Sequence, residues 1–223
     1  MKSSVCSARK QRGFTLIEIA IVLVIIGLLV GGILQGQELI ESSRVKQAVR
    51  DINSTAAAVF SYQDRYGTMP GDDGPVAALT ARGSSWTSAV AGDADGNLEV
   101  VLSATFSGAT ESGAFWQHLK SAGFLSGNPA DTAAAALPGN AWGGLIGVTT
   151  ADMGGGLVGT KVCESQVPGA SAISIDNALD DGLGDTGRVR ATLGAGGVNT
   201  DPTDVSLVLP YSEDNVYTVC YRM

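Results

Sequence analysis

Glu18 has the clearest potential for chemistry in this sequence, because it stands inside an apolar run. Residues 14–34 are 21 residues with a single charge, that of Glu18. At about 1.5 Å per residue, the run predicts a helix about 31 Å long, enough to cross the hydrocarbon core of a bilayer. A carboxylate inside a membrane costs about 2.5–3.5 kcal/mol on insertion scales, and such residues are functional candidates. Glu18 is therefore the first candidate site residue.

The residues around Glu18 follow a fixed order. A basic segment comes first, then Gly13, Phe14 and Thr15, and then Glu18 near the start of the apolar run. This segment, KQRGFTLIEIAIVLVIIGLL, closely resembles the N-terminus of type IV pilin precursors and their pseudopilin relatives. The resemblance implies that a prepilin peptidase/N-methyltransferase cuts the basic leader between Gly13 and Phe14 and methylates the new amine of Phe14. It also implies that Glu18, the fifth residue of the mature chain, recruits the subunit into a helical filament with other pilin or pseudopilin subunits.

The physical argument for Glu18 agrees with this resemblance. Cleavage creates an amine at Phe14, and a buried carboxylate costs much less free energy when it is paired. We hypothesise that Glu18 pairs with the Phe14 amine of a neighbouring subunit and sets the axial register. The alternatives are an ordinary signal anchor or a secretory signal peptide. The second needs a shorter apolar run and an A-x-A-like cleavage site, which VGGILQGQEL does not offer.

Charge limits the partners of this chain. Four of the 14 basic residues precede Phe14, so the mature chain carries 10 basic and 22 acidic side chains, a net charge of −12. That balance argues against nucleic-acid binding. The basic leader predicts a cytoplasmic N-terminus and a C-terminal domain on the other side of the membrane after a single pass. The resemblance implies that this is the bacterial inner membrane with the head in the periplasm, before incorporation into a pilus, a pseudopilus or the cell surface. An enzyme has little support, because His118 is the single histidine and no nucleophile motif is present.

Two cysteines remain after the leader with Cys6 is removed. Cys163 and Cys220 form an even pair in an oxidising compartment. A bridge between them would close a loop of nearly 60 residues, worth about 4 kcal/mol in the chain-entropy model. Pilins often have a C-terminal region bounded by a disulfide, and this pair resembles it. Two unrelated buried thiols are the alternative.

One loop has the composition of a calcium site. Oxygen-bearing side chains alternate at Asp93, Asp95, Asn97 and Glu99, as in the first half of an EF-hand loop. However, Leu98 takes the position of the usual glycine and Ala104 that of the bidentate glutamate. Calcium and a solvated acidic turn both remain open, and no other cofactor is indicated. Asp180, Asp181 and Asp185 are a second candidate metal cluster.

The periodicity places these residues on predicted elements. Val45, Val49, Ile52, Ala56 and Val59 recur at helical spacing, which predicts one helix over residues 14–66. Gly67 and Pro70 should end it. Glycines at 27, 31, 32 and 36 either soften the helix or permit close helix contact. The run YQDRYGTMPGDD, together with ID-x-x-LDDG and TGRVRA, resembles a subgroup of pilin-like proteins.

The remaining pattern predicts short elements. These are a helix over 113–123, an ambiguous helix over 170–179, and strands over 141–149, 156–163, 186–191, 205–209 and 216–221. The fold class expected is α+β, with a long N-terminal helix packed on a small antiparallel sheet, as the resemblance implies. The expected organisation is a leader (1–13), a transmembrane or filament-core helix (14–34), its amphipathic continuation (35–66) and a globular head (67–223).

The function expected from these observations is structural. The chain is predicted to be a subunit of a type IV pilus or pilus-like filament. Alternatives are a pseudopilin of a type II secretion system, a minor pilin, or a membrane-anchored periplasmic binding protein. Glu18 favours a body or ordinary minor subunit over the pseudopilin class that lacks this glutamate.

Overall fold

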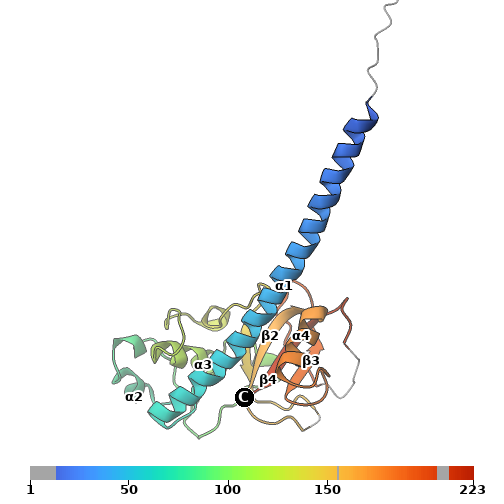
Figure 1. Ribbon diagram of the computed structural model, residues 1–223. Helices are drawn as coiled ribbons and strands as arrows, with labels where there is room; N and C mark the ends of the chain where they lie inside the picture. The colour runs from blue at the N-terminus through green and yellow to red at the C-terminus, as the bar shows by residue number, and fades with distance from the viewer. Residues whose placement is uncertain (1–13, 155, 205–210) are drawn as a thin grey trace, which may run out of the picture. The chain divides into compact units, whose positions relative to one another are not determined.

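The computed structural model describes residues 14–154, 156–204 and 211–223, and these divide into two compact units at residues 41 and 42 (Figure 1). The leader, with Cys6 and Gly13, lies outside the described residues. So does the strand predicted over 205–209. Each unit is described by itself below.

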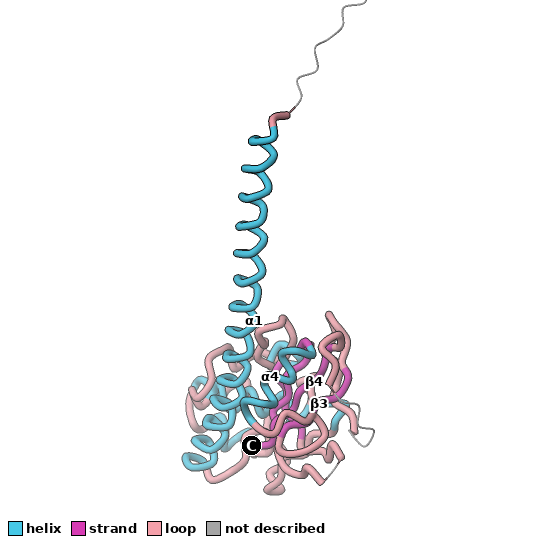
Figure 2. The backbone as a smooth tube through the Cα atoms, turned by 45° about the vertical axis from the view of Figure 1, so that its right-hand side comes forward, coloured by secondary structure: helices cyan, strands magenta, loops and turns pink. Residues whose placement is uncertain are grey.

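Helix α1 (Leu16–Tyr66) is a single helix of 51 residues and contributes to both units (Figure 2). The helix is continuous through Gly31, Gly32 and Gly36. It ends as predicted, because Gly67 adopts a φ of +73° and its N–H donates to the carbonyl of Gln63 at 2.8 Å. This left-handed residue is the usual glycine terminator of a helix.

The sheet of the second unit has four antiparallel strands in the order β1-β2-β4-β3. The strands are β1 (Ile146–Thr149), β2 (Lys161–Pro168), β3 (Val189–Leu193) and β4 (Val216–Arg222). The α+β class with a long N-terminal helix is thereby confirmed. Three predicted ranges were wrong at their starts, because residues 141–145, 156–160 and 186–188 precede the strands. Their glycines favour turns and bends over paired backbone, and Leu145 makes an isolated bridge to Gly139.

The remaining helices of the second unit are short. They are α2 (Val76–Thr80), α3 (Thr110–Ser121) and α4 (Gly169–Leu179), with 3₁₀ turns η1 (Ser84–Trp86), η2 (Leu102–Ala104) and η3 (Ala133–Ala136). Helix α3 is buried on every side from Ser112 to Ser121. Gly113 makes this possible, since a Cβ there would collide with the carbonyl of Gly108.

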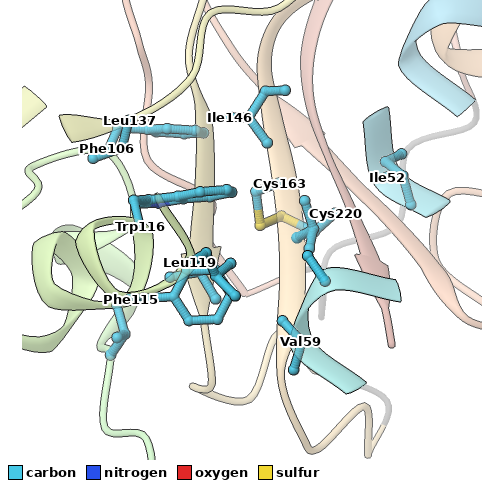
Figure 3. Packing of buried hydrophobic residues seen from close by; sticks show 14 of the residues in the cluster. Ile52, Val59, Phe106, Phe115, Trp116, Leu119, Leu137, Ile146, Cys163 and Cys220 are labelled. Carbon is cyan, nitrogen blue, oxygen red and sulfur yellow. A yellow bond between two sulfur atoms is a disulfide. The ribbon is translucent and has the colours of Figure 1, made fainter. Parts of the chain in front are cut away.

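The core of the second unit joins α1, α3 and the sheet. Two residues of the predicted stripe, Ile52 and Val59, are buried, and the other three are half-buried. The buried residues of α1 are Ala48, Ile52, Thr55, Ala58, Val59 and Tyr62. Cys163 and Cys220 are directly opposed on β2 and β4, and the disulfide predicted between them is present. Figure 3 shows the sulfur atoms of this bridge pointing toward Trp116 of α3. Each large apolar side chain buried here contributes about 1.5–3 kcal/mol.

Candidate functional site

The first unit presents the candidate assembly site at the start of α1. Phe14 lies before the helix and is 84% exposed. The carboxylate of Glu18, through Oε2, accepts hydrogen bonds from the backbone N–H of Thr15 at 2.7 Å and from its hydroxyl at 2.8 Å. In return, the N–H of Glu18 donates to Oγ1 of Thr15 at 3.3 Å.

This reciprocal arrangement is a capping box. The T-x-x-E spacing lets the side chains of Thr15 and Glu18 satisfy each other's backbone N–H groups at a helix N-terminus. The spacing is visible in the sequence, so a capping box was a signal that sequence reasoning missed. Glu18 therefore has a role within its own chain, in addition to the intersubunit pairing predicted for it.

The surface of α1 behind Glu18 is apolar and has no cover within its own unit. Every residue from 14 to 35 is exposed. Among the described residues, α1 is the helix whose length and composition are sufficient to cross a membrane. A continuous apolar surface of this size in water would be strongly unfavourable, so it requires lipid or other protein around it.

The four glycines of this segment leave the helix surface open. A Cβ built at Gly27, Gly31, Gly32 or Gly36 would meet no atom within 4 Å. Their absence of side chains therefore serves no packing need within the described chain. This observation fits close approach of a second helix, one of the two interpretations of these residues.

In the second unit, the acidic loop is arranged differently from the predicted calcium site. Asp93 and Asp95 accept N–H groups of their own loop, from Asp95 at 3.3 Å and from Asn97 at 2.8 Å. The structure gathers another set, with carboxylate oxygens of Asp72, Asp93 and Glu111 within 4.8 Å of one another. Neither Asp95 nor Asn97 belongs to it, and Glu99 contributes its N–H to Glu111 at 2.6 Å.

The partners of this acidic group are mainly backbone N–H groups. Asp72 accepts from Asp95 and Gly96, each at 3.1 Å. Burial raises the pKa of Asp72 and that of Glu111, against these hydrogen bonds, and neighbouring carboxylates raise them further. Asp93, Glu99 and Glu111 line a hollow of about 490 Å³. The calcium prediction stays a prediction, now with Asp72 and Glu111 beside Asp93.

The second acidic cluster forms around Asp176, Asp180 and Asp181, and Asp185 is not part of it. These carboxylates hold a loop together. Asp176 accepts from the hydroxyl of Tyr211 at 2.7 Å, Asp180 accepts the N–H groups of Arg188 and Val189, and Asp181 accepts from the Thr186 hydroxyl at 2.6 Å. Their hydrogen bonds account for the LDDG and TGRVRA motifs as a loop and strand start.

The YQDRYGTMPGDD motif has a structural explanation that sequence reasoning missed. Asp73 is buried and accepts from the phenol of Tyr62 at 2.6 Å and from Arg82 at 2.7 Å. Burial raises the pKa of Asp73, but the hydrogen bonds from Arg82 and Tyr62 outweigh it and hold that pKa below its ordinary value. The motif thus fastens the end of α1 to the loop that follows it.

His118 completes this junction as a packing residue, as predicted. Its ring stacks on Tyr62, with centroids 6.1 Å apart. Its Nδ1 accepts the N–H of Gly71 at 3.0 Å, so Nε2 carries the proton and donates to the carbonyl of Val90 at 2.8 Å. Burial lowers the pKa of His118, so the ring is neutral.

Comparison with known proteins adds one finding to this geometry. Residues 8–34 match the family model described as the prokaryotic N-terminal methylation motif. That motif, the signal peptide of type IV prepilins, belongs to structural proteins of the pilin type rather than to enzymes. No curated protein and no solved structure matches the chain.

Proposed function

Because residues 8–34 match the prokaryotic N-terminal methylation motif, which supports a type IV pilin-like or pseudopilin protein, we propose that this chain is a structural subunit of a type IV pilus or pilus-like filament. The observation that carries the proposal is the apolar surface of α1 over residues 16–34, exposed along its whole length, with Glu18 at its entrance. This surface would be stored in the inner membrane and then transferred to the core of a filament, with the head on the periplasmic side.

Processing prepares the assembly site. Prepilin peptidase/N-methyltransferase would cut between Gly13 and Phe14 and methylate the Phe14 amine, which then lies close to Glu18 in sequence. In the described chain both side-chain hydrogen bonds to Thr15 use Oε2 of Glu18. We propose that Oε1 accepts the Phe14 amine of a neighbouring subunit. One carboxylate would then cap its own helix and fix the position of the next.

Assembly exchanges one apolar environment for another. Leaving lipid for neighbouring helices brings little hydrophobic gain, so close packing and pairing of Glu18 must drive the step. The open positions at Gly27, Gly31, Gly32 and Gly36 allow neighbouring backbones to approach. Pairing also removes the cost of an isolated carboxylate in an apolar core.

The Glu18 proposal is tested by substitution within the same helix. Glu18→Ala should leave membrane insertion and leader cleavage intact. It should reduce filament incorporation by at least tenfold, because it removes the carboxylate that pairs with the Phe14 amine of the neighbouring subunit. Glu38→Ala is the matched control, an exposed glutamate of α1 outside the apolar run. Normal incorporation of Glu18→Ala would contradict the proposal.

The location of the mature protein separates the filament types. Intact mass should match residues 14–223 with one added methyl group and two hydrogens fewer for the Cys163–Cys220 bridge. Recovery of that mass from sheared surface filaments supports a pilus subunit. Recovery from membranes alone supports a type II secretion pseudopilin or a minor pilin. An uncut chain would overturn the proposal and leave a membrane-anchored domain, the arrangement expected of a membrane-anchored periplasmic binding protein.

A further inference from the structure

Glu164 is a buried acid without a partner in the middle of the sheet. The residue lies on β2, its exposed fraction is 0%, and neither carboxylate oxygen has a hydrogen-bond partner among the described residues. Its cross-strand neighbours are Ile146 on β1 and Val219 on β4, both buried and apolar. An ionised carboxylate in such surroundings is strongly unfavourable, whereas a protonated one is tolerated.

The strands supply no cation to Glu164. Because side chains alternate along a strand, Glu164 and Cys163 point to opposite faces of the sheet. Lys161 shares the face of Cys163, and its cross-strand partner Arg222 shares it too. Arg190 pairs in register with Cys220 and also belongs to that face. Strand β1 contains no charged residue.

Within residues 14–154, 156–204 and 211–223, the nearby helices supply no cation either. The charge found to act on Glu164 there is that of Asp51 on α1, which is also negative. On α4, Asp176 interacts with Tyr211, Asp180 and Asp181. Arg50 is exposed on α1 and acts on Asp51. Burial first, and then the charge of Asp51, raise the pKa of Glu164 to about 8.

Water can reach the interface between α1 and the sheet, here called the seam, beside Asp51. A hollow of about 220 Å³ is lined by Asp51, Thr55 and Ile146, together with Gln47 and Pro138. Ile146 is the cross-strand neighbour of Glu164. A proton can therefore enter or leave near Glu164 after a small local opening rather than after unfolding of the whole unit. Burial raises the pKa of Asp51 as well. Ionisation is therefore disfavoured at both acids of this interface, Asp51 and Glu164.

We propose that Glu164 is a proton-operated latch between α1 and the sheet. With its proton, Glu164 allows residues 48–62 of α1 to pack on the sheet. Without the proton, the carboxylate repels Asp51 and draws water into the seam, which loosens the hold of the head on α1. In a filament subunit, which is the function proposed above, the latch holds the head most firmly at acidic pH, and the hold weakens as pH rises toward the folded pKa of Glu164.

Linkage gives the direction and size of the effect. A glutamate in an unfolded chain has a pKa of about 4.3, whereas that of Glu164 in the folded chain is about 8. The folded state therefore binds one more proton between these two values. Stability is highest below this window and falls as pH rises through it, with up to a tenfold increase in the unfolding equilibrium constant per pH unit.

The experiment uses the full mature chain in detergent micelles, with the disulfide intact. Thermal midpoints and hydrogen exchange of the α1 amides at 48–62 are measured from pH 6 to pH 9.5. The thermal midpoint and the amide protection of wild type should fall as pH rises. Those of Glu164→Gln should stay constant, and at pH 9 they should be higher than those of wild type. Glu213→Gln is the matched control, an exposed glutamate that should follow wild type. Identical pH profiles for wild type and Glu164→Gln would overturn the proposal.

A second measurement needs no substitution. Carbon-13 labelling of glutamate carboxyl groups in the wild-type chain should reveal one carboxyl that titrates near pH 8. If every glutamate titrates below pH 6, the latch is excluded even where Glu164→Gln fails to fold. Neither result depends on filament assembly, so failure of the latch and failure of the proposed function are distinguishable.

Discussion

Asp73 and Arg82 form a two-point ion pair at the end of helix α1. Nη1 of Arg82 lies 2.7 Å from Oδ2 of Asp73, and Nη2 lies 3.2 Å from Oδ1. The guanidinium also lies over the rings of Tyr66 and Trp86, at 4.4 and 4.9 Å from their centroids. The two residues therefore connect the last turn of α1 to the loop that leaves it.

Loss of this pair should destabilise the head. Asp73→Asn removes the carboxylate that receives Tyr62 and Arg82 and leaves the guanidinium without its partner. We expect the free energy of unfolding to fall by about 3 kcal/mol, the lower end of the usual effect of removing one partner of a buried ion pair. Denaturant unfolding in detergent measures it. Asp214→Asn, at an exposed site, should change the value by less than about 0.5 kcal/mol; equal losses in both variants would contradict the role of the pair.

Acid should erase the difference between wild type and Asp73→Asn. The folded pKa of Asp73 is below its ordinary value, so its stabilisation is present above that ordinary value and is lost as pH falls through the folded pKa. The stability gap should be constant above about pH 5 and shrink below about pH 4. A gap that grows with acid would show that the sign is wrong.

Thr15 and Glu18 should separate capping from assembly. Thr15→Ala removes the hydroxyl of the capping box and keeps the carboxylate, at a cost of about 1 kcal/mol to the helix N-terminus. We expect Thr15→Ala to retain most filament incorporation and Glu18→Ala to lose it, as scored by the sheared fraction. If Thr15→Ala is as defective as Glu18→Ala, capping rather than pairing is the main role of Glu18.

Removal of the disulfide should weaken the sheet. The double variant Cys163→Ala/Cys220→Ala should lose about 2–4 kcal/mol, because the unfolded chain regains the freedom of a long loop. Wild type unfolded with a reductant should match the variant, and the variant itself should not respond to the reductant. A variant as stable as oxidised wild type would show that the bridge is dispensable.

Calcium offers a test of the acidic group in the head. If Asp72, Asp93 and Glu111 bind calcium, millimolar calcium should raise the thermal midpoint of wild type by offsetting the repulsion among their carboxylates. Asp93→Asn should reduce that response, and Asp214→Asn should keep it. No shift in wild type at millimolar calcium counts against the prediction.

Features with local causes could be predicted from the sequence. The helix ending at Gly67, the strand at Val216 and the order of residues around Glu18 follow from periodicity and short motifs. The disulfide could be proposed because two cysteines remained. Strand starts at residues 141, 156 and 186 were placed too early, because segments that contain glycine give a weak periodic signal.

Features that depend on tertiary contacts could not be predicted. Asp72 and Glu111 join Asp93 from segments well separated from it in sequence. The isolation of Glu164 was also hidden, because β2 carries polar residues on both faces and its sequence does not show which face α1 covers. Asp73 was noticed within a motif, but its partner Arg82 lies outside that motif.

Formation of the disulfide depends on the register of β2 and β4, because Cys163 and Cys220 lie directly opposite each other. A shift of one residue between β2 and β4 would send the two sulfur atoms to opposite faces of the sheet, and a shift of two would carry them out of bonding range. Once β2 and β4 are paired, only the native register therefore brings the two sulfur atoms within bonding distance. The disulfide fixes the native register of β2 and β4 covalently. It therefore prevents the two strands from slipping past each other when a force acts on the head.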